Sequence, residues 1–272
     1  MERTSHPSEL LDLAARHAAA FDGLAVDIPT VDQLMAADAA LTEAEGRGYR
    51  YIPTSALPQV QSVPAEALSP GLFVTAKGRD ALAALAEDGR RKTAVIGTRD
   101  TSFYGRSVTE RVVDSLRDGV LVVSFGLGVA YIAMQRALEK KIPVIAVMPT
   151  GPGECYPHSM RGLLQRIEET RGCAVVTPFF PHTEPTPIRF LYRHRITAAL
   201  ADEVIVTESK IRGGAMVAAR LADSFGREVR AVSGRCDDIR SFGCIQLIAE
   251  GTARVWTPWA PGTIPVDNTA VL

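Results

Sequence analysis

Cationic residues and glycines stand where short apolar runs of this sequence end, and that pattern could bind phosphate. The run 93–97 ends in Gly97; Thr98 and Arg99 come directly after it, and Ser102 follows shortly after. An arginine can make a forked pair of hydrogen bonds to a phosphate, and a helix that begins after such a loop presents free N–H groups to an anion. An arginine that pairs with Asp100 or caps a neighbouring helix is the structural alternative, and these residues alone leave both interpretations open.

Further candidate groups follow other apolar runs. The segment RFLYRHR (189–195) interleaves basic and aromatic residues, a mixture that suits single-stranded nucleic acid because it offers partners to phosphates and to base faces. Arg193 and Arg195 would point about 160° apart in a helix, so one can face a ligand while the other anchors the sheet edge. Tyr156 could stack on a base or plug the end of the sheet. The other candidate residues are Ser124, Gly128, Lys210, Arg212, Gly213 and Gly214.

Motifs that would indicate catalysis are missing. The sequence holds no nucleophile elbow, no HExxH and no phosphate-loop lysine after GxxxxG. Ser124 with His158 or His194 could form a nucleophile and base on paper, but their spacing does not support it. The histidines are scattered and the four cysteines show no CxxC pair, so we expect reduced thiols, no metal, no cofactor and no enzyme activity.

Strands alternating with helices must position these loops. Brief β-branched runs recur at 72–76, 93–97, 120–124, 142–148, 173–177, 203–207 and 228–233, and helical patterns between them include 105–117, 159–169 and 214–224. This alternation predicts an α/β fold: an extended Rossmann-like, doubly wound, mostly parallel sheet with helices on both faces. Since ligands bind beyond the carboxyl ends of such strands, Arg99, Arg193 and Arg212 should converge on one face.

Composition sets the wider limits. The chain has 272 residues, 46% of them hydrophobic, and a net charge of −1, so a nucleic-acid role needs a local basic patch. The sequence shows no signal-type apolar region at its N-terminus and no run of about 18 apolar residues, which predicts a cytoplasmic protein without a membrane span. We divide it into a helical N-terminal segment with a Pro-rich linker (1–70), a Rossmann-like domain (71–255) and a short tail (256–272).

The order of motifs resembles the DNA-processing protein A (DprA/Smf) family over roughly residues 70–253. The family's Gly-Ser-Arg and later Tyr-Gly are matched by 97–99 and 104–105, and its Ser and Gly after the next strand by Ser124 and Gly128. Its Gly…Tyr-Pro element is similar to Gly151 with 156–157, and its Phe-Pro-x-Arg-Asn-Arg-Ile to 190–196. Its Ser-Gly-Ser after a Glu is similar to 212–214 after Glu208, and its late elements to 226–227, Gly234 and GCIQLI (243–248).

Departures from the family pattern lie on the same loops. The family's Gly-Ile-Asp and the following Ala-His are GVA (128–130) and Ala133-Met134 here, so an acidic and a histidine side chain are missing. The central Asn of Arg-Asn-Arg is His194, and Ser-Gly-Ser is Arg-Gly-Gly. We expect Arg212 and His194 to make this face more cationic.

The resemblance implies a single-stranded DNA-binding protein of DNA uptake and recombination that helps to load a RecA-type recombinase. We expect a homodimer, with Arg99 holding a phosphate at the carboxyl end of the sheet. The alternative is a Rossmann-like pocket that binds or hydrolyses a nucleotide-derived small molecule. A structural partner protein that has lost ligand binding is a third interpretation.

Overall fold

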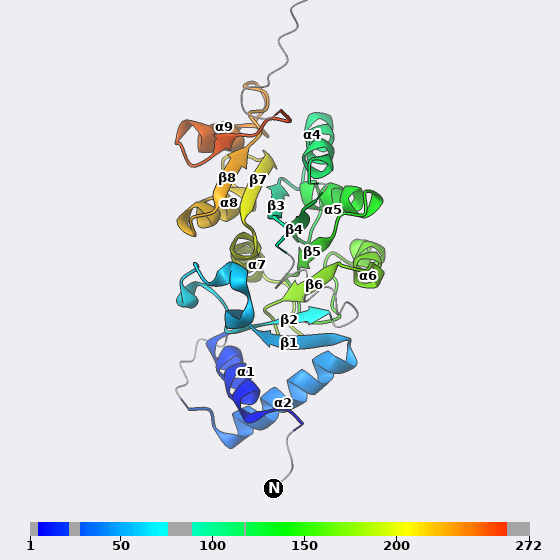
Figure 1. Cartoon of the computed structure of the whole chain (residues 1–272), viewed down its shortest axis with the longest axis vertical. Helices are drawn as coiled ribbons and strands as arrows, with labels where there is room; N and C mark the ends of the chain where they lie inside the picture. Colours follow the sequence, from blue (N-terminus) through cyan, green and yellow to red (C-terminus); the bar gives the residue numbers. More distant parts are fainter. Residues whose placement is uncertain (1–4, 22–27, 76–88, 117, 260–272) are drawn as a thin grey trace, which may run out of the picture.

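Nine strands form one sheet at the centre of the computed structural model, which describes residues 5–21, 28–75, 89–116 and 118–259 (Figure 1). The strands are β1 (Tyr49–Pro53), β2 (Gly71–Thr75), β3 (Lys92–Gly97), β4 (Val120–Ser124), β5 (Val144–Val147), β6 (Ala174–Thr177), β7 (Glu203–Glu208), β8 (Glu228–Ala231) and β9 (Arg254–Val255). The helices are α1 (Ser8–Phe21), α2 (Val31–Gly46), α4 (Phe103–Asp114), α5 (Val129–Glu139), α6 (Arg161–Glu169), α7 (Pro187–Leu200), α8 (Gly214–Ser224) and α9 (Phe242–Ala249). Residue 117 of one predicted helix, residue 76 of one predicted strand and residues 260–272 of the predicted tail lie outside the described residues.

The strand order is β1-β2-β6-β5-β4-β3-β7-β8-β9. From β6 to β9 every neighbouring pair is parallel, whereas β2 runs antiparallel to both β1 and β6. Figure 1 shows α4, α5 and α6 on one side of the sheet and α7, α8 and α9 on the other. The predicted doubly wound, mostly parallel α/β fold is therefore confirmed.

The apolar runs form strands because both of their faces are covered. Every residue of β4, β5 and β6 is buried, as expected for strands without polar alternation. One core cluster joins the sheet to α4, α5 and α6, and the other joins it to α7, α8 and α9. The fold thus leaves the ends of the strands, rather than the faces of the sheet, for a ligand.

The N-terminal segment differs from the expected linker. Strand β1 includes the first residues of the predicted Pro-rich linker, which begins at residue 51, and it pairs with β2 through five residue pairs. Pairing is tight because Gly71 lies against the ring of Tyr51, where a Cβ would come within 2.2 Å of Cζ. This edge strand gives only a weak signal in the sequence, because its alternation covers three residues and its last residue is a proline.

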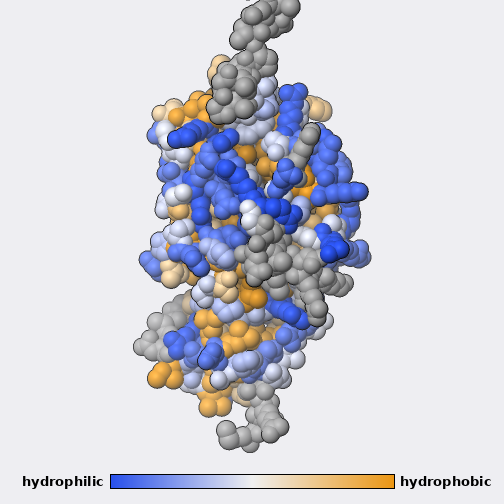
Figure 2. Space-filling view, viewed as in Figure 1, coloured by the Kyte–Doolittle hydropathy of each residue, from blue (hydrophilic) through white to orange (hydrophobic). Residues whose placement is uncertain are grey.

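Packing ties this N-terminal segment to the rest of the sheet. His17 of α1 is fully buried, its Nδ1 lies 2.9 Å from the Tyr51 hydroxyl, and its ring lies 5.2 Å from that of Phe180. Figure 2 shows hydrophobic patches over the N-terminal helices and a largely hydrophilic face over the central strands. In the described part of the chain, no helix combines the length and the hydropathy needed to cross a membrane.

Candidate functional site

A cavity of about 460 Å³ lies beyond the carboxyl ends of β3, β4 and β7, between the beginnings of α7 and α8. We call it the cationic cavity. The predicted site residues that line it are Gly97, Thr98, Arg99, Ser124, Arg193, Lys210, Arg212, Gly213 and Gly214. Arg99, Arg193 and Arg212 thus converge at one end of the sheet, as the strand-end argument predicts. Their binding role stays a prediction.

Phe190 organises two of these arginines. The Arg99 guanidinium carbon lies 5.1 Å from the centre of the Phe190 ring, and that of Arg193 lies 4.9 Å from it. Contacts of this kind are attractive because the ring face carries negative charge. Phe190 was not among the predicted site residues, although the mixed basic and aromatic composition of 189–195 signalled it.

Arg193 is the deepest cation of the cavity. Its side chain is only 4% exposed, its Nη1 donates to the carbonyl oxygen of Phe125, and its Nε has no hydrogen-bond partner among the described residues. Arg193 lies on the buried side of helix α7, which begins where Thr186 caps its start and Pro187 occupies its first turn. No ion pair joins Arg193 to a carboxylate in the described ranges.

Burial, together with the smaller effect of the neighbouring Arg99, lowers the pKa of Arg193 to about 9. The guanidinium therefore still carries its charge at neutral pH. A buried cation without an anion is costly, because desolvation is not repaid by an ion pair. An anion that enters the cavity would offset this desolvation cost.

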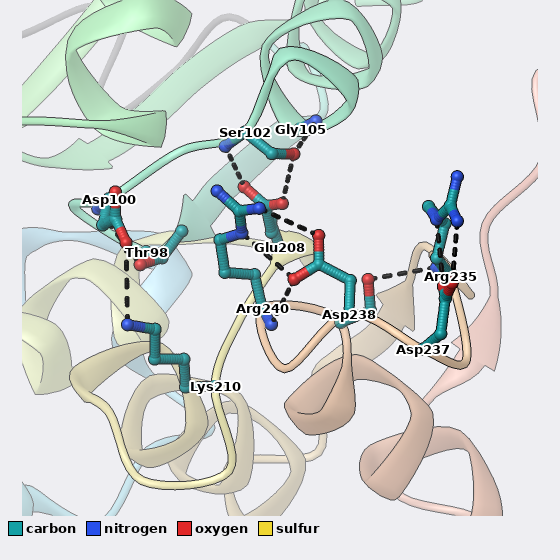
Figure 3. Close-up of polar contacts among 11 residues, drawn as sticks. Thr98, Asp100, Ser102, Gly105, Glu208, Lys210, Arg235, Asp237, Asp238 and Arg240 are labelled. Carbon is teal, nitrogen blue, oxygen red and sulfur yellow. Dashed lines mark hydrogen bonds and ion pairs between the residues drawn. The ribbon is translucent and has the colours of Figure 1, made fainter.

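The more exposed cations line the mouth of the cavity. Lys210 Nζ lies 3.6 Å from Asp100 Oδ2 (Figure 3), so its charge is partly balanced. Arg99 and Arg212 are exposed. Four cationic side chains and one carboxylate line the cavity, which leaves a net charge of three positive units. The helix α8 begins at this wall, and its first turn directs N–H groups and the positive end of the helix dipole towards it.

The prediction that the helix start after β3 presents free N–H groups to a ligand is wrong. The backbone N–H of Ser102 donates to Glu208 Oε2 (2.9 Å), and its hydroxyl donates to Oε1 (2.5 Å). The hydroxyl also accepts from the Gly105 N–H and caps α4 (Figure 3). Glu208 is 2% exposed and supplies the anion at this helix end itself. Ser102 is therefore a capping residue outside the cavity.

His194 does not add the expected positive charge. Burial, together with the nearby charges of Arg193 and Arg99, lowers its pKa to about 3, so the ring is neutral at pH 7. Its Nδ1 lies 2.9 Å from the Ser124 hydroxyl, which also lies 2.7 Å from the Thr197 hydroxyl. The serine and histidine that could be paired on paper are thus neighbours. A ring with so low a pKa is a weak general base at neutral pH.

Three other predicted residues, Arg195, Tyr156 and Gly128, lie outside the cavity. Arg195 projects away from it, with Nη1 3.4 Å from the Ala67 carbonyl oxygen and its guanidinium over the ring of Tyr192. This confirms that Arg193 and Arg195 diverge. Tyr156 lines a neighbouring hollow, and its ring centre lies 5.7 Å from that of Phe190, which lines the cavity.

Gly128 is needed for its backbone. Its φ is +72°, and a Cβ there would lie 2.2 Å from the carbonyl oxygen of Thr98. This close approach lets the Val129 N–H donate to that same oxygen over 3.1 Å. Gly128 therefore positions the Arg99 loop against α5 without lining the cavity.

The variant Gly214→Ala should be destabilised by about 1–3 kcal/mol, since inserted methyl groups are costly in packed regions. A Cβ on Gly214 would lie 2.6 Å from Nε2 of His194. Combining it with His194→Asn should recover part of the loss, and denaturant unfolding of the single and double variants measures the coupling. The control Gly162→Ala, where a Cβ meets nothing within 4 Å, should be neutral or stabilising. Additive losses in the double variant would contradict this packing.

Comparison with known proteins identifies the family. The sequence model of the family described as DNA recombination-mediator protein A matches residues 72–260. The chain belongs to this family. The chain is 34% identical over 165 residues to DNA processing protein DprA of Streptococcus pneumoniae, covering 60% of this chain and 58% of that protein. It is also 34% identical over 175 residues to a putative DprA of Mycobacterium tuberculosis, covering 64% of this chain and 44% of that protein. The matched region spans about half the length of these relatives.

Two solved DprA structures share the fold. DprA of Streptococcus pneumoniae superposes with a TM-score of 0.67 at 25% identity, over 93% of this chain and 92% of that one. The structure of DprA of Helicobacter pylori was described for its single-stranded DNA binding mode. It superposes with a TM-score of 0.63 at 26% identity, over 77% of this chain and 92% of that one. The resemblance drawn from the sequence motifs is thereby confirmed.

Proposed function

We propose that this chain binds single-stranded DNA through the cationic cavity and acts in DNA uptake or recombination. The buried Arg193, which lacks a carboxylate partner among the described residues, is the observation that carries the proposal. It stands beside Arg99 in a cavity with a surplus of positive charge. The H. pylori relative, which is described as binding single-stranded DNA, supports the same ligand here.

Each group of the cavity has a proposed task. Arg99 and Arg212 at the mouth contact phosphate oxygens through charge-assisted hydrogen bonds. Arg193 anchors the deepest phosphate, and the N–H groups at the start of α8 add further donors. Lys210 contributes attraction at longer range. Phosphate contacts carry no base information, so binding should be largely independent of sequence.

Assembly and partners belong to the same proposal. Family membership supports a homodimer that delivers single-stranded DNA to a RecA-type recombinase. The proposed role is binding rather than catalysis, which agrees with the low pKa of His194 beside Ser124.

A pocket for a nucleotide-derived small molecule is the second candidate. A volume of about 460 Å³ falls in the range of pockets that hold small ligands, roughly 300–1,000 Å³. This candidate predicts tight binding of a free nucleotide together with weak binding of oligonucleotides.

The variant Arg99→Ala should weaken oligo-dT binding about ten- to a hundredfold, because about 1.5–3 kcal/mol of charge-assisted hydrogen bonding is lost. Arg99→Lys should recover only part, since an ammonium cannot make the planar pair of bonds. The slope of log affinity against log salt should flatten by about 0.7 for the one lost phosphate contact. Fluorescence anisotropy measures both quantities. A folded Arg99→Ala protein that binds like the parent would remove Arg99 from the site.

A further inference from the structure

Two cations of the cationic cavity, Arg99 and Arg193, lie over one ring and can share one phosphate, and an internal phosphate of a DNA strand would balance only one of their two charges. Arg99 and Arg193 stand on one ring, Phe190, with guanidinium carbons 5.1 and 4.9 Å from its centre. Neither is in an ion pair within the described residues, and the pKa of Arg193 is lowered by burial first and by the charge of Arg99 second. An internal phosphodiester brings one negative charge, whereas a terminal phosphomonoester brings about 1.5–2 at neutral pH.

The depth of Arg193 favours the same ligand. The side chain is 4% exposed, and Gly126 lies beside its guanidinium, where a Cβ would make ordinary contact with Nη2 at 3.5 Å. An internal phosphate that reached this depth would need room for two departing chain segments. A terminal phosphate needs room for one.

The walls also offer donors suited to a dianion. The unpartnered Nε of Arg193 adds a buried donor, and the start of α8 at Gly213 and Gly214 adds the positive end of a helix dipole. The carboxylate at the mouth, Asp100, forms an ion pair with Lys210. The net charge of three positive units is therefore open to an incoming anion.

We propose that the cationic cavity recognises the phosphorylated end of a single-stranded DNA, with Arg193 and Arg99 holding the terminal phosphomonoester. This inference rests on the proposed function and deepens it, because it distinguishes the end of a strand from its interior. The 5′ and 3′ phosphates share this chemistry, and the experiment separates them.

The test uses four forms of one oligo-dT, carrying a 5′-phosphate, a 3′-phosphate, two hydroxyl ends or a closed circle, each with an internal fluorophore. Anisotropy titrations with the full chain should show that one terminal-phosphate form binds at least about tenfold more tightly than the hydroxyl-ended and circular forms. The matching thymidine monophosphate should compete for that extra affinity. In Arg193→Met the phosphorylated and hydroxyl-ended forms should bind alike.

The outcomes separate this inference from the proposed function. Equal affinities for all four forms would overturn end recognition and leave single-strand binding intact. A preference that persists in Arg193→Met would also overturn it, since the added charge would then act elsewhere. Absence of binding by every form would overturn the proposed function itself.

Discussion

The variant Arg193→Met is expected to bind an oligo-dT that carries the preferred terminal phosphate at least about a hundredfold more weakly than the parent. Hydrogen bonds to charged groups contribute about 1.5–3 kcal/mol each, and Arg193 lies at the upper end because its surroundings exclude water. Without DNA, the free energy of unfolding should change by less than about 1 kcal/mol. The lost bond to the Phe125 carbonyl is offset by removal of a buried charge that has no carboxylate partner.

The matched control is Arg220→Met, which removes the same charge from a surface position of α8. Arg220 pairs with Glu250 over 2.7 Å at the surface, and such pairs contribute little. Anisotropy should show near-parental DNA binding for this variant, and denaturant unfolding should show that both variants are folded. Strong binding by a folded Arg193→Met protein would contradict the proposed site.

Acid should destabilise the protein well before its carboxyl groups are protonated. Burial lowers the pKa of His17 from 6.5 to about 3, so the unfolded chain binds a proton in this interval and the folded chain does not. Stability due to the neutral ring is fully present above pH 6.5 and falls as the pH drops towards 3, by about 1.4 kcal/mol per pH unit. Between pH 6.5 and 4.5 the free energy of unfolding should therefore fall by about 2 kcal/mol.

His194 acts in the same direction, since its pKa is also lowered to about 3. Protonation of both rings should therefore about double the loss in the free energy of unfolding. Denaturant unfolding at several pH values measures it, and His194→Asn should reduce the slope by up to half. His17→Gln should be less stable at pH 7 and show a flatter dependence. A free energy of unfolding that does not change over this interval would contradict the burial of both neutral rings.

The sequence predicted the sheet well because buried parallel strands leave a strong local signal. Runs such as 120–124 and 203–207 are β-branched, brief and bounded by loop residues, and the structure places β4 and β7 there. Strand β1 was missed because an edge strand next to prolines lacks that signal. Its place is fixed by long-range packing of Tyr51 against Gly71 and His17, which no local pattern records.

The candidate site was predictable in position and less so in detail. The rule that ligands bind beyond the carboxyl ends of parallel strands brought Arg99, Arg193 and Arg212 to one cavity. The state of each group depends on neighbours distant in sequence. Glu208 occupies the helix start near Ser102, and burial keeps His194 neutral. Neither effect follows from residue type and spacing alone.

Equilibrium binding of the parent chain to labelled oligo-dT, as a single strand and as a duplex with oligo-dA across a salt series, tests the central claim most directly. We expect the single strand to bind more tightly than the duplex. Its log affinity should fall against log salt with a slope of about −2, as three phosphate contacts require. Weak, salt-insensitive binding of the single strand, together with tight binding of a free nucleotide, would contradict DNA binding by the cationic cavity.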